Sequence, residues 1–313
     1  MSNRLVDLII VSAGNPNYLN SCLSSALKQI LPPSRIIVID NSNQREISAI
    51  FKGFQDRVDF FSLDKPSSYA AALNAGIAIS RGDFTLCMND DAVLEVGYLE
   101  RAIRGFSIDK NIGMVSGKIL RADRINVDST GLFLSLCRTA YERGYGLKDQ
   151  GQFRNEGYVF GVSGAVAFYR RQMLESIKNG QEYFDADFGF FYEDLDLAWR
   201  AQRSGWKGYY IPEAIAYHIR GSSARKKQGI GKRCARNYID DALYFDLVKN
   251  RWLVIIKNER VLDFLFHLPF IILYDIFTLF HIILFRPKLL TRFKLERIPW
   301  RNMLNKRLIN KKI

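Results

Sequence analysis

The chain has 313 residues, of which 48% are hydrophobic and 25% charged, and its formal net charge is +13. This length accommodates one large α/β domain of roughly 200–250 residues with a helical appendage. The composition excludes a disordered or collagen-like protein. No CxxC pair occurs among the four cysteines, Cys22, Cys87, Cys137 and Cys234, which argues against a zinc ribbon or a disulfide framework and fits a reduced cytoplasm. Residues 1–7 hold no apolar run, so we expect no signal peptide.

The positive charge is concentrated in two segments. Residues 286–313 carry ten Lys or Arg and one acid, residues 220–236 carry seven Lys or Arg and no acid, and the remainder of the chain is mildly acidic. Such local basic segments indicate anionic partners, for example diphosphates or lipid head groups. Nucleic acid is not expected as a partner, because the sequence has no helix-turn-helix, zinc-finger or RNP-like pattern.

The first half of the chain alternates between apolar strands and amphipathic helices. Its pattern predicts strands at residues 5–11, 36–39, 59–63 and 84–88, with helices at 18–29 and 69–80. Polar clusters directly follow two of these strands: Asp40-Asn41-Ser42 and Asn89-Asp90-Asp91. Open parallel sheets place their ligand sites at such carboxyl ends of strands.

The second half has a less regular pattern. It predicts helices at residues 97–107, 170–178 and 194–204, and strands at 113–120, 159–169, 209–211 and 214–217. Residues 121–155 form a looser insert with little periodicity, and from residue 237 onward we expect helices. No internal repeat or low-complexity linker is present.

Each polar cluster allows a structural and a chemical interpretation. Asp90 and Asp91 suit a divalent cation shared with a phosphate-bearing ligand, because Mg²⁺ and Mn²⁺ prefer oxygen ligands. Taken alone, the same pair also fits a solvated turn. Asp40 would accept the imide N–H of a pyrimidine base, or would simply end its strand.

A third cluster places Glu193, Asp194 and Asp196 at the start of a helix, directly after three aromatic residues. Acids suit the N-terminus of a helix, and Asp196 is spaced to pair with Arg200 one turn later. Three acids are more than capping requires. A carboxylate beside low-dielectric aromatic rings is suited to act as a general base with a raised pKa.

In their order and spacing, these clusters resemble the inverting glycosyltransferase family 2, which has a GT-A fold, and especially its rhamnosyltransferase-like branch. The resemblance extends from about residue 5 to residue 223. The motifs that carry it are Val11-Ser12, Val38-Ile39-Asp40-Asn41-Ser42, Asn74-Ala75-Gly76-Ile77, Arg81-Gly82-Asp83, Asn89-Asp90-Asp91, residues 161–165, Glu193-Asp194-Leu195-Asp196, Gly205-Trp206, Pro212-Glu213-Ala214 and His218.

The resemblance implies a role for each matching residue. Asp40 would contact the nucleobase of a donor, Asn74 would make a further polar contact to the donor, and Asp90 would face the ribose. Asp194 would be the catalytic base.

It also implies a metal site. Asp91 and His218, with Asn89, would hold Mg²⁺ or Mn²⁺ against the donor diphosphate. Asn89 departs from the Asp that many members have there. Because an amide is a weaker metal ligand than a carboxylate, the site would depend more on Asp91 and His218.

The basic loop at residues 220–236 contains Gly221, Gly229 and Gly231 as candidate hinges. It either folds over the donor as a lid or is a solvated loop.

Residues 261–285 are apolar and numerous enough to span a bilayer as one helix. Asp263, His267, Pro269, Asp275 and His281 interrupt the stretch, and charged groups are costly at the membrane centre. We therefore expect two amphipathic helices lying on an anionic membrane surface, followed by the basic tail. The alternatives are a homo-oligomer interface or a helical cap on the core.

The resemblance thus implies a GT-A catalytic domain at residues 1–235, with donor and acceptor halves at about 1–95 and 96–235, and we expect a helical basic region at 236–313. The expected function is inverting, metal-dependent transfer of a sugar, such as rhamnose or another hexose. The donor would be UDP-, dTDP- or GDP-linked, and the acceptor a saccharide or glycolipid at the inner face of the cell membrane.

Two other functions fit the sequence less well. A nucleotidyltransferase normally has a Gly-rich loop with a basic residue, which Ser12-Ala13-Gly14-Asn15-Pro16 does not provide. A non-catalytic nucleotide-sugar-binding protein or membrane scaffold would not need all of Asp40, Asp90, Asp91 and Asp194.

Overall fold

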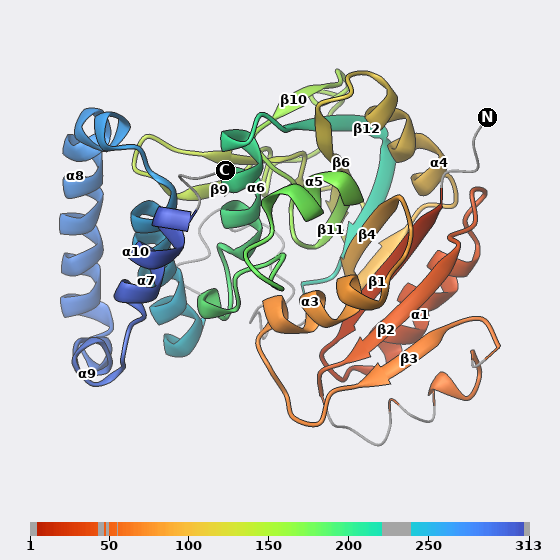
Figure 1. Cartoon of the computed structure of the whole chain (residues 1–313), viewed down its shortest axis with the longest axis horizontal. Coiled ribbons are helices and arrows are strands. Elements are labelled where there is room, and N and C mark those ends of the chain that lie inside the picture. Colours follow the sequence, from red (N-terminus) through yellow and green to blue (C-terminus); the bar gives the residue numbers. More distant parts are fainter. Residues whose placement is uncertain (1–4, 43–46, 48–49, 55, 221–238, 310–313) are drawn as a thin grey trace.

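The computed structural model describes residues 5–42, 47, 50–54, 56–220 and 239–309. Its main sheet has the strand order β10-β12-β6-β11-β4-β1-β2-β3. Helices cover the sheet, and a group of C-terminal helices packs beside it (Figure 1). This arrangement confirms the predicted α/β class.

The first half of the sheet is parallel. Strands β1 (Val6–Ser12), β2 (Arg35–Asp40), β3 (Asp59–Ser62) and β4 (Phe84–Asn89) alternate with helices α1 (Pro16–Leu27) and α3 (Tyr69–Ile79), as the sequence predicted. Strand β1 lies between β2 and β4. In register, Ser12 pairs with Asp40 and Val11 with Asn89, so both polar clusters lie at the same edge of the sheet.

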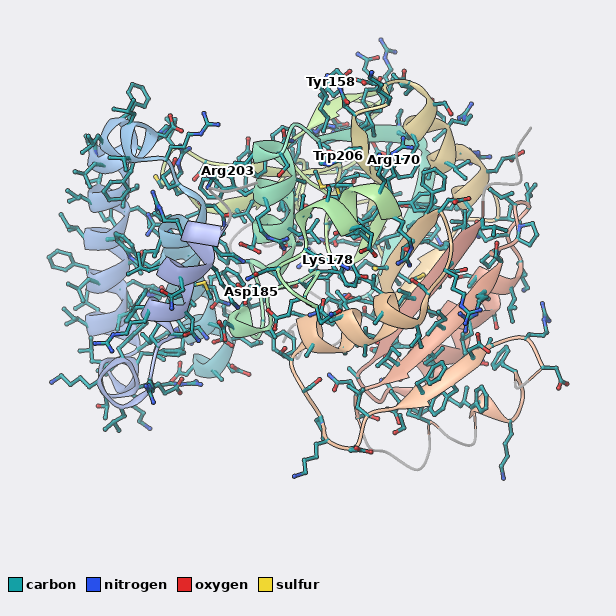
Figure 2. The ribbon with its side chains drawn as sticks, in the orientation of Figure 1. Tyr158, Arg170, Lys178, Asp185, Arg203 and Trp206 are labelled. Carbon is teal, nitrogen blue, oxygen red and sulfur yellow. The ribbon has the colours of Figure 1, made fainter. Side chains whose placement is uncertain are left out.

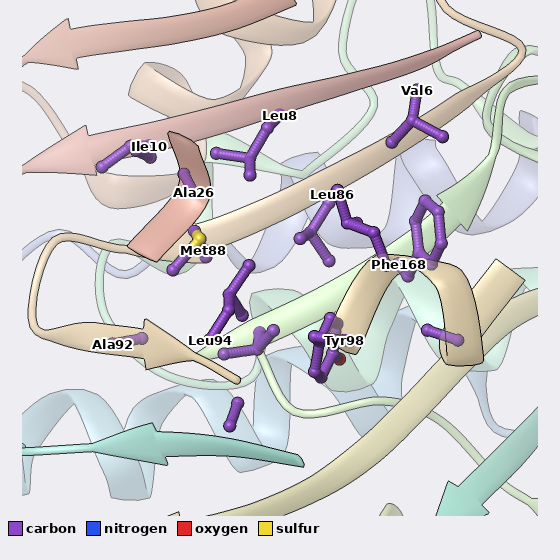
Figure 3. Packing of buried hydrophobic residues seen from close by; sticks show 14 of the residues in the cluster. Val6, Leu8, Ile10, Ala26, Leu86, Met88, Ala92, Leu94, Tyr98 and Phe168 are labelled. Carbon is purple, nitrogen blue, oxygen red and sulfur yellow. The ribbon is translucent and has the colours of Figure 1, made fainter. Parts of the chain in front are cut away.

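Side chains of β1 alternate between two hydrophobic layers. Val6, Leu8 and Ile10 pack with the α1 side of the sheet (Figure 3), whereas Ile9 and Val11 pack with the α3 side. Burial of each such side chain contributes roughly 1.5–3 kcal/mol. A strand buried on both faces reads as a continuous apolar run, which is why β1 was recognisable from sequence.

The second half of the sheet is mixed. Strand β11 (Val166–Arg170) runs antiparallel between β4 and β6 (Ile112–Arg121), and β12 (Lys207–His218) runs parallel to β6. This part of the chain also contains the strands β5 (Ala92–Leu94) and β10 (Gly157–Val159). Its helices are α4 (Tyr98–Ala102), which is followed by a 3-10 turn at Ile103–Ser107, α5 (Arg171–Ile177) and α6 (Glu193–Arg203).

The second half differs from the predicted outline in three places. Residues 159–169 are not one strand, because β10 and β11 are separated by residues that turn along the cavity described below. The strands predicted at 209–211 and 214–217 form the single strand β12, in which a bulge between Ile211 and Ile215 contains Pro212, Glu213 and Ala214. The insert at 121–155 contains the short strands β7 (Val127–Ser129), β8 (Leu132–Leu134) and β9 (Ala140–Glu142).

The C-terminal helices are α7 (Asp241–Asn258), α8 (Val261–Phe285), α9 (Lys288–Leu295) and α10 (Trp300–Ile309). Helix α7 packs against α6, and α10 packs along α7 with Met303 fully buried. Asp185 and Arg203 lie where these helices meet the α/β domain (Figure 2): Lys257 pairs with Asp185, and Arg203 donates to the carbonyl of Asn258.

The two amphipathic helices predicted at 261–285 are one continuous helix, α8, and Pro269 lies inside it without ending it. Among the described residues, α8 is the one helix whose length and apolarity would allow it to cross a membrane. Ile271, Thr278 and Ile282 form its buried side, and the opposite side is apolar and exposed.

Candidate active site

A cavity opens at the carboxyl ends of β1, β2 and β4. It is lined by Val11, Ser12, Ala13, Asn41, Tyr69, Asn89, Asp90, Glu142, Ser163, Gly164, Ala165, Phe190, Phe191, Glu193, Asp194, His218 and Arg220. Four of the seven residues predicted for the site, Asn89, Asp90, Asp194 and His218, line this cavity. Asp40, Asn74 and Asp91 lie outside the lining.

Asp90 is fixed by the first strand. Its Oδ2 accepts hydrogen bonds from the Ser12 hydroxyl (3.0 Å) and from the Ala13 backbone N–H (2.8 Å). Burial raises the pKa of Asp90 to about 6, although these two donors oppose the rise. The carboxylate is therefore held rigidly at the floor of the cavity.

His218 ends strand β12 and joins two buried acids. Pairing of β12 with β5 places His218 opposite Ala92, so its Nε2 lies 3.1 Å from Asp91 Oδ1. Its Nδ1 lies 2.9 Å from Asp128 Oδ2. Burial alone would lower the pKa of His218, but Asp91 and Asp128 outweigh burial and raise it to about 9.

Asp128, on β7, was not predicted from the sequence. It is fully buried, and besides His218 it accepts a hydrogen bond from the Arg220 Nε. Burial would raise the pKa of this carboxyl, but Arg220 and His218 hold it well below its usual range. Asp128 thus joins His218 and Arg220, both of which line the cavity.

The donor atoms at this end of the cavity fit a divalent cation. Asn89 Oδ1 is buried without a hydrogen-bond partner in the described part of the chain, and Asn89 Nδ2 lies 3.4 Å from His218 Nε2. An amide oxygen, a carboxylate and an imidazole are suitable ligands for Mn²⁺ or Mg²⁺. No group of three His, Cys, Asp or Glu side chains converges within the described ranges, so a cation here would also need ligands from a bound phosphate.

Asp194 lies in the first turn of helix α6 and lines the cavity. Its Oδ2 accepts a hydrogen bond from Gly164 N (3.0 Å), and its Oδ1 accepts one from Leu195 N (2.8 Å). Burial raises the pKa of Asp194 despite these two donors. Each oxygen of this desolvated carboxylate accepts one backbone N–H and keeps a further lone pair, so the group is suited to accept a proton.

Glu193 and Glu142 add two carboxyl groups to the same cavity. Glu193 Oε2 is buried and has no hydrogen-bond partner among the described residues, and burial together with Asp194 raises its pKa to about 8. Glu142, on β9, hydrogen-bonds the Ser129 hydroxyl, and burial and Asp194 raise its pKa to about 7. Glu142 lies in the insert at residues 121–155, and the sequence of this insert has no periodicity from which Glu142 could have been predicted as a site residue.

The other predicted residues make contacts of their own. Asp40 is buried and accepts hydrogen bonds from the backbone N–H (2.9 Å) and hydroxyl (2.6 Å) of Ser42, while its neighbour Asn41 lines the cavity. Asn74 accepts from the N–H groups of Tyr183 and Phe184 and donates to the Phe184 carbonyl. The donor contact expected of Asn74 stays a prediction.

The predicted lid was residues 220–236. Arg220 is described above, but Gly221, Gly229 and Gly231 lie outside the described residues, as does Cys234.

Comparison with known proteins identifies relatives of this chain. A family model described as "Glycosyltransferase like family 2" matches residues 3–239. The O-antigen chain rhamnosyltransferase WbaN of Salmonella anatum is 24% identical over 218 residues, which cover 69% of this chain and 66% of the relative. The poly-beta-1,6-N-acetyl-D-glucosamine synthase of Staphylococcus epidermidis is 21% identical over 216 residues, covering 68% of this chain but only 50% of that protein.

Two solved structures share the fold. GalNAc-T7, determined with UDP, GalNAc and Mn²⁺, has a TM-score of 0.60 at 14% identity, covering 81% of this chain and 48% of that one. The mannosyltransferase PcManGT of Pyrobaculum calidifontis, in complex with GDP-Man and Mn²⁺, has a TM-score of 0.57 at 14% identity, covering 97% and 84%. These similarities confirm the predicted GT-A fold with C-terminal helices.

Proposed function

Since this chain belongs to glycosyltransferase family 2, we propose that it transfers a sugar, with inversion at the anomeric carbon, from a nucleoside-diphosphate donor to an acceptor hydroxyl. The observation that carries the proposal is that Asp194 lines the same cavity as Asp90 and His218. The proposed proton acceptor and the side chains proposed to bind the sugar donor therefore line one cavity.

In this proposal, Asp194 takes the proton of the acceptor hydroxyl. Gly164 N–H holds one of its oxygens (3.0 Å), which orients the carboxylate toward the cavity. The acceptor oxygen attacks the anomeric carbon from the face opposite the diphosphate, so one displacement inverts that centre. Inversion requires a base on the acceptor side and no covalent nucleophile, a feature shared with inverting glycosidases.

The donor would occupy the edge formed by β1, β2 and β4. Asp40 and Asn41 are candidates for the nucleobase, and Asp90, fixed by Ser12 and Ala13, for the ribose. Asp91, His218 and Asn89 would hold Mg²⁺ or Mn²⁺, which as a Lewis acid would stabilise charge on the departing diphosphate. Arg220, held by Asp128, adds a cation on the same side.

The sugar and the acceptor are proposed from the relatives. WbaN is named as a rhamnosyltransferase and the staphylococcal relative as a polysaccharide synthase, so we propose a hexose or deoxyhexose donor and a saccharide acceptor. The two structural neighbours contain different nucleotides, UDP in one and GDP-Man in the other, so we take UDP-, dTDP- and GDP-linked sugars as candidates.

We also propose that α8 places the enzyme on an anionic membrane surface, beside a lipid-linked acceptor. The inner side of α8 is held by α7, since Arg251 pairs with Asp275 at 2.6 Å. Its outer side exposes large apolar residues, among them Leu262, Phe266 and Phe277. A helix held along one side fits a position in the interface plane, and the basic α9 would add attraction to anionic lipids.

A donor panel tests the proposed reaction. UDP-, dTDP- and GDP-sugars are screened with Mn²⁺ for thermal stabilisation, because a ligand at 100 Kd adds ~2.7 kcal/mol to the free energy of unfolding. With the donor found, Asp194→Asn should keep donor affinity and lower turnover by ~10²–10⁴-fold, the usual contribution of a general base. Failure of every donor to stabilise the protein, or near-normal turnover of Asp194→Asn, would contradict the proposal.

A further inference from the structure

The loop that precedes helix α6 has an unusual backbone. Phe191 and Tyr192 both have positive φ angles, of 68° and 73°. Each L-residue in the left-handed region costs roughly 1–2 kcal/mol, and two in succession persist only where the surroundings over-determine the conformation. Phe190 and Phe191 line the cavity, and the helix that follows begins with Glu193 and Asp194.

One side chain holds this loop. Asn250, on α7, is fully buried, and its Nδ2 donates to the carbonyl oxygens of Phe188 (2.5 Å), Phe190 (2.6 Å) and Phe191 (2.8 Å). An amide NH₂ has two hydrogens, so the three carbonyls share them. Buried carbonyl groups need such partners, and here one amide draws three of them toward the same point.

Helix α7 also holds the body of α6. Lys257 Nζ donates to Asp196 Oδ2 (2.8 Å), and Asn258 Nδ2 donates to Asp196 Oδ1 (2.8 Å). The matched family region ends at residue 239, whereas these contacts come from α7, which begins at Asp241. Supports of the catalytic helix therefore lie beyond the segment that the family model recognises.

We propose that Asn250 is a positioning residue for the transfer reaction: it holds Phe188–Tyr192 in the strained conformation that directs Asp194 at the acceptor. This inference rests on the proposed function. A small displacement of a catalytic group, of ~1 Å, lowers a rate on the order of 10²-fold. Loss of the Asn250 amide should therefore lower turnover and leave the donor side, built on β1 and β4, unchanged.

The test compares Asn250→Ala and Asn250→Asp with Phe245→Leu. Asp has nearly the shape of Asn but, when ionised, donates no hydrogen bond to the three carbonyls. Phe245 is equally buried on α7 but packs in the cluster with Ile239, Ile282 and Leu289, away from the loop, and so serves as a control for lost stability. Four quantities are measured for each variant: the melting temperature, the hydrogen exchange of amides 188–196, the calorimetric Kd for UDP, dTDP or GDP with Mn²⁺, and the turnover.

We expect faster exchange at 188–196 in both Asn250 variants, turnover lowered by ~10–100-fold, and nucleotide Kd changed by less than about twofold. Phe245→Leu should lose stability without these effects. Unchanged exchange or turnover in the Asn250 variants, or an equal turnover loss in Phe245→Leu, would overturn the inference.

Failure of this inference about Asn250 can be distinguished from failure of the proposed function. A wild-type protein that binds no nucleotide and transfers no sugar ends the proposed function, and the exchange data then still decide whether Asn250 holds the loop. A wild-type protein that transfers sugar while both Asn250 variants do so equally well ends only this inference.

Discussion

Asp128 Oδ2 lies 2.9 Å from His218 Nδ1, although the two residues are 90 positions apart in the chain. Register brings them together: β6 pairs with β7 on one side and with β12 on the other, so Asp128 and His218 both lie near Arg121. A carboxylate at Nδ1 keeps a proton on that nitrogen, so a cation bound at Nε2 would displace the second proton of the imidazolium.

The first prediction follows from this pair. Asp128→Asn should weaken Mn²⁺ binding, measured by calorimetry with nucleoside diphosphate present, by ~10–100-fold, as is typical when the partner of a metal-binding histidine is lost. Asp109→Asn is the matched control, because Asp109 pairs with Lys207 at the opposite end of β12. Equal Mn²⁺ affinity in wild type and Asp128→Asn would show that His218 is not a ligand.

The second prediction concerns stability and pH. Burial and Asp194 raise the pKa of Glu193 from 4.5 to about 8. Between these values the folded protein binds a proton that the unfolded chain has lost, so the free energy of unfolding falls as pH rises. The contribution is complete below the unfolded pKa and is lost as pH rises through about 8.

Glu193→Gln, which stays neutral, should therefore gain melting temperature relative to wild type between about pH 5 and about pH 9. Glu100→Gln, an exposed change of the same kind on α4, should show no such trend. A difference between Glu193→Gln and wild type that is constant with pH would mean that Glu193 is ionised throughout this range.

The third prediction concerns the close approach of Gly164 to Asp194, the proposed base. A Cβ at Gly164 would lie 3.3 Å from Asp194 Oδ2, so Gly164→Ala must displace the carboxylate by a few tenths of an ångström. We expect turnover to fall by ~10-fold or more with little change in melting temperature. Gly157→Ala, where the added Cβ meets no atom within 4 Å, should behave as wild type. Normal turnover in Gly164→Ala would argue against Asp194 as the base.

The fourth prediction tests the membrane surface of α8. Replacement of Leu262, Phe266, Phe277 and Phe280 by Gln changes exposed side chains only, so the fold and donor binding should persist. Flotation with anionic liposomes should be lost. In the control, Lys288→Gln with Lys294→Gln on α9, flotation should weaken but retain a salt-resistant part, since each basic residue near an anionic surface contributes only ~1 kcal/mol. If wild-type protein never floats with the liposomes, the membrane proposal is wrong. If the α8 variant has a different light-scattering mass from wild type, α8 is better explained as an oligomer interface.

The parallel half of the sheet could be predicted from sequence because its signals are local. Strand β1 is a continuous apolar run and Asn15-Pro16 begins α1, with the Asn15 side chain accepting from the N–H groups of Asn17 and Tyr18. The Asp196–Arg200 pair, predicted from helical spacing, is present at 2.9 Å. The motifs at strand ends were found for the same reason.

The insert could not be predicted, because its signals are not local. Strands β7 and β9 have three residues each, too few for a period, and their pairing depends on β6 and β8. Asp128 and Glu142 were therefore invisible as site residues. Asn250 gave no signal either: a lone polar residue in a helical pattern does not reveal the three carbonyls it meets.

Helix α8 is bracketed by parts of the catalytic unit rather than attached as a tail. Before it, Glu259 pairs with Arg138. After it, α10 returns to α7, where Lys306 pairs with Asp185 and Arg307 donates to the Ile256 carbonyl. The segment between Arg260 and Pro299 is thus held at both of its ends. A change of residues between these two anchors would therefore alter the exposed surface of α8 and leave α10 in place, whereas a truncation before Val261 would also remove the contacts of α10 with α7.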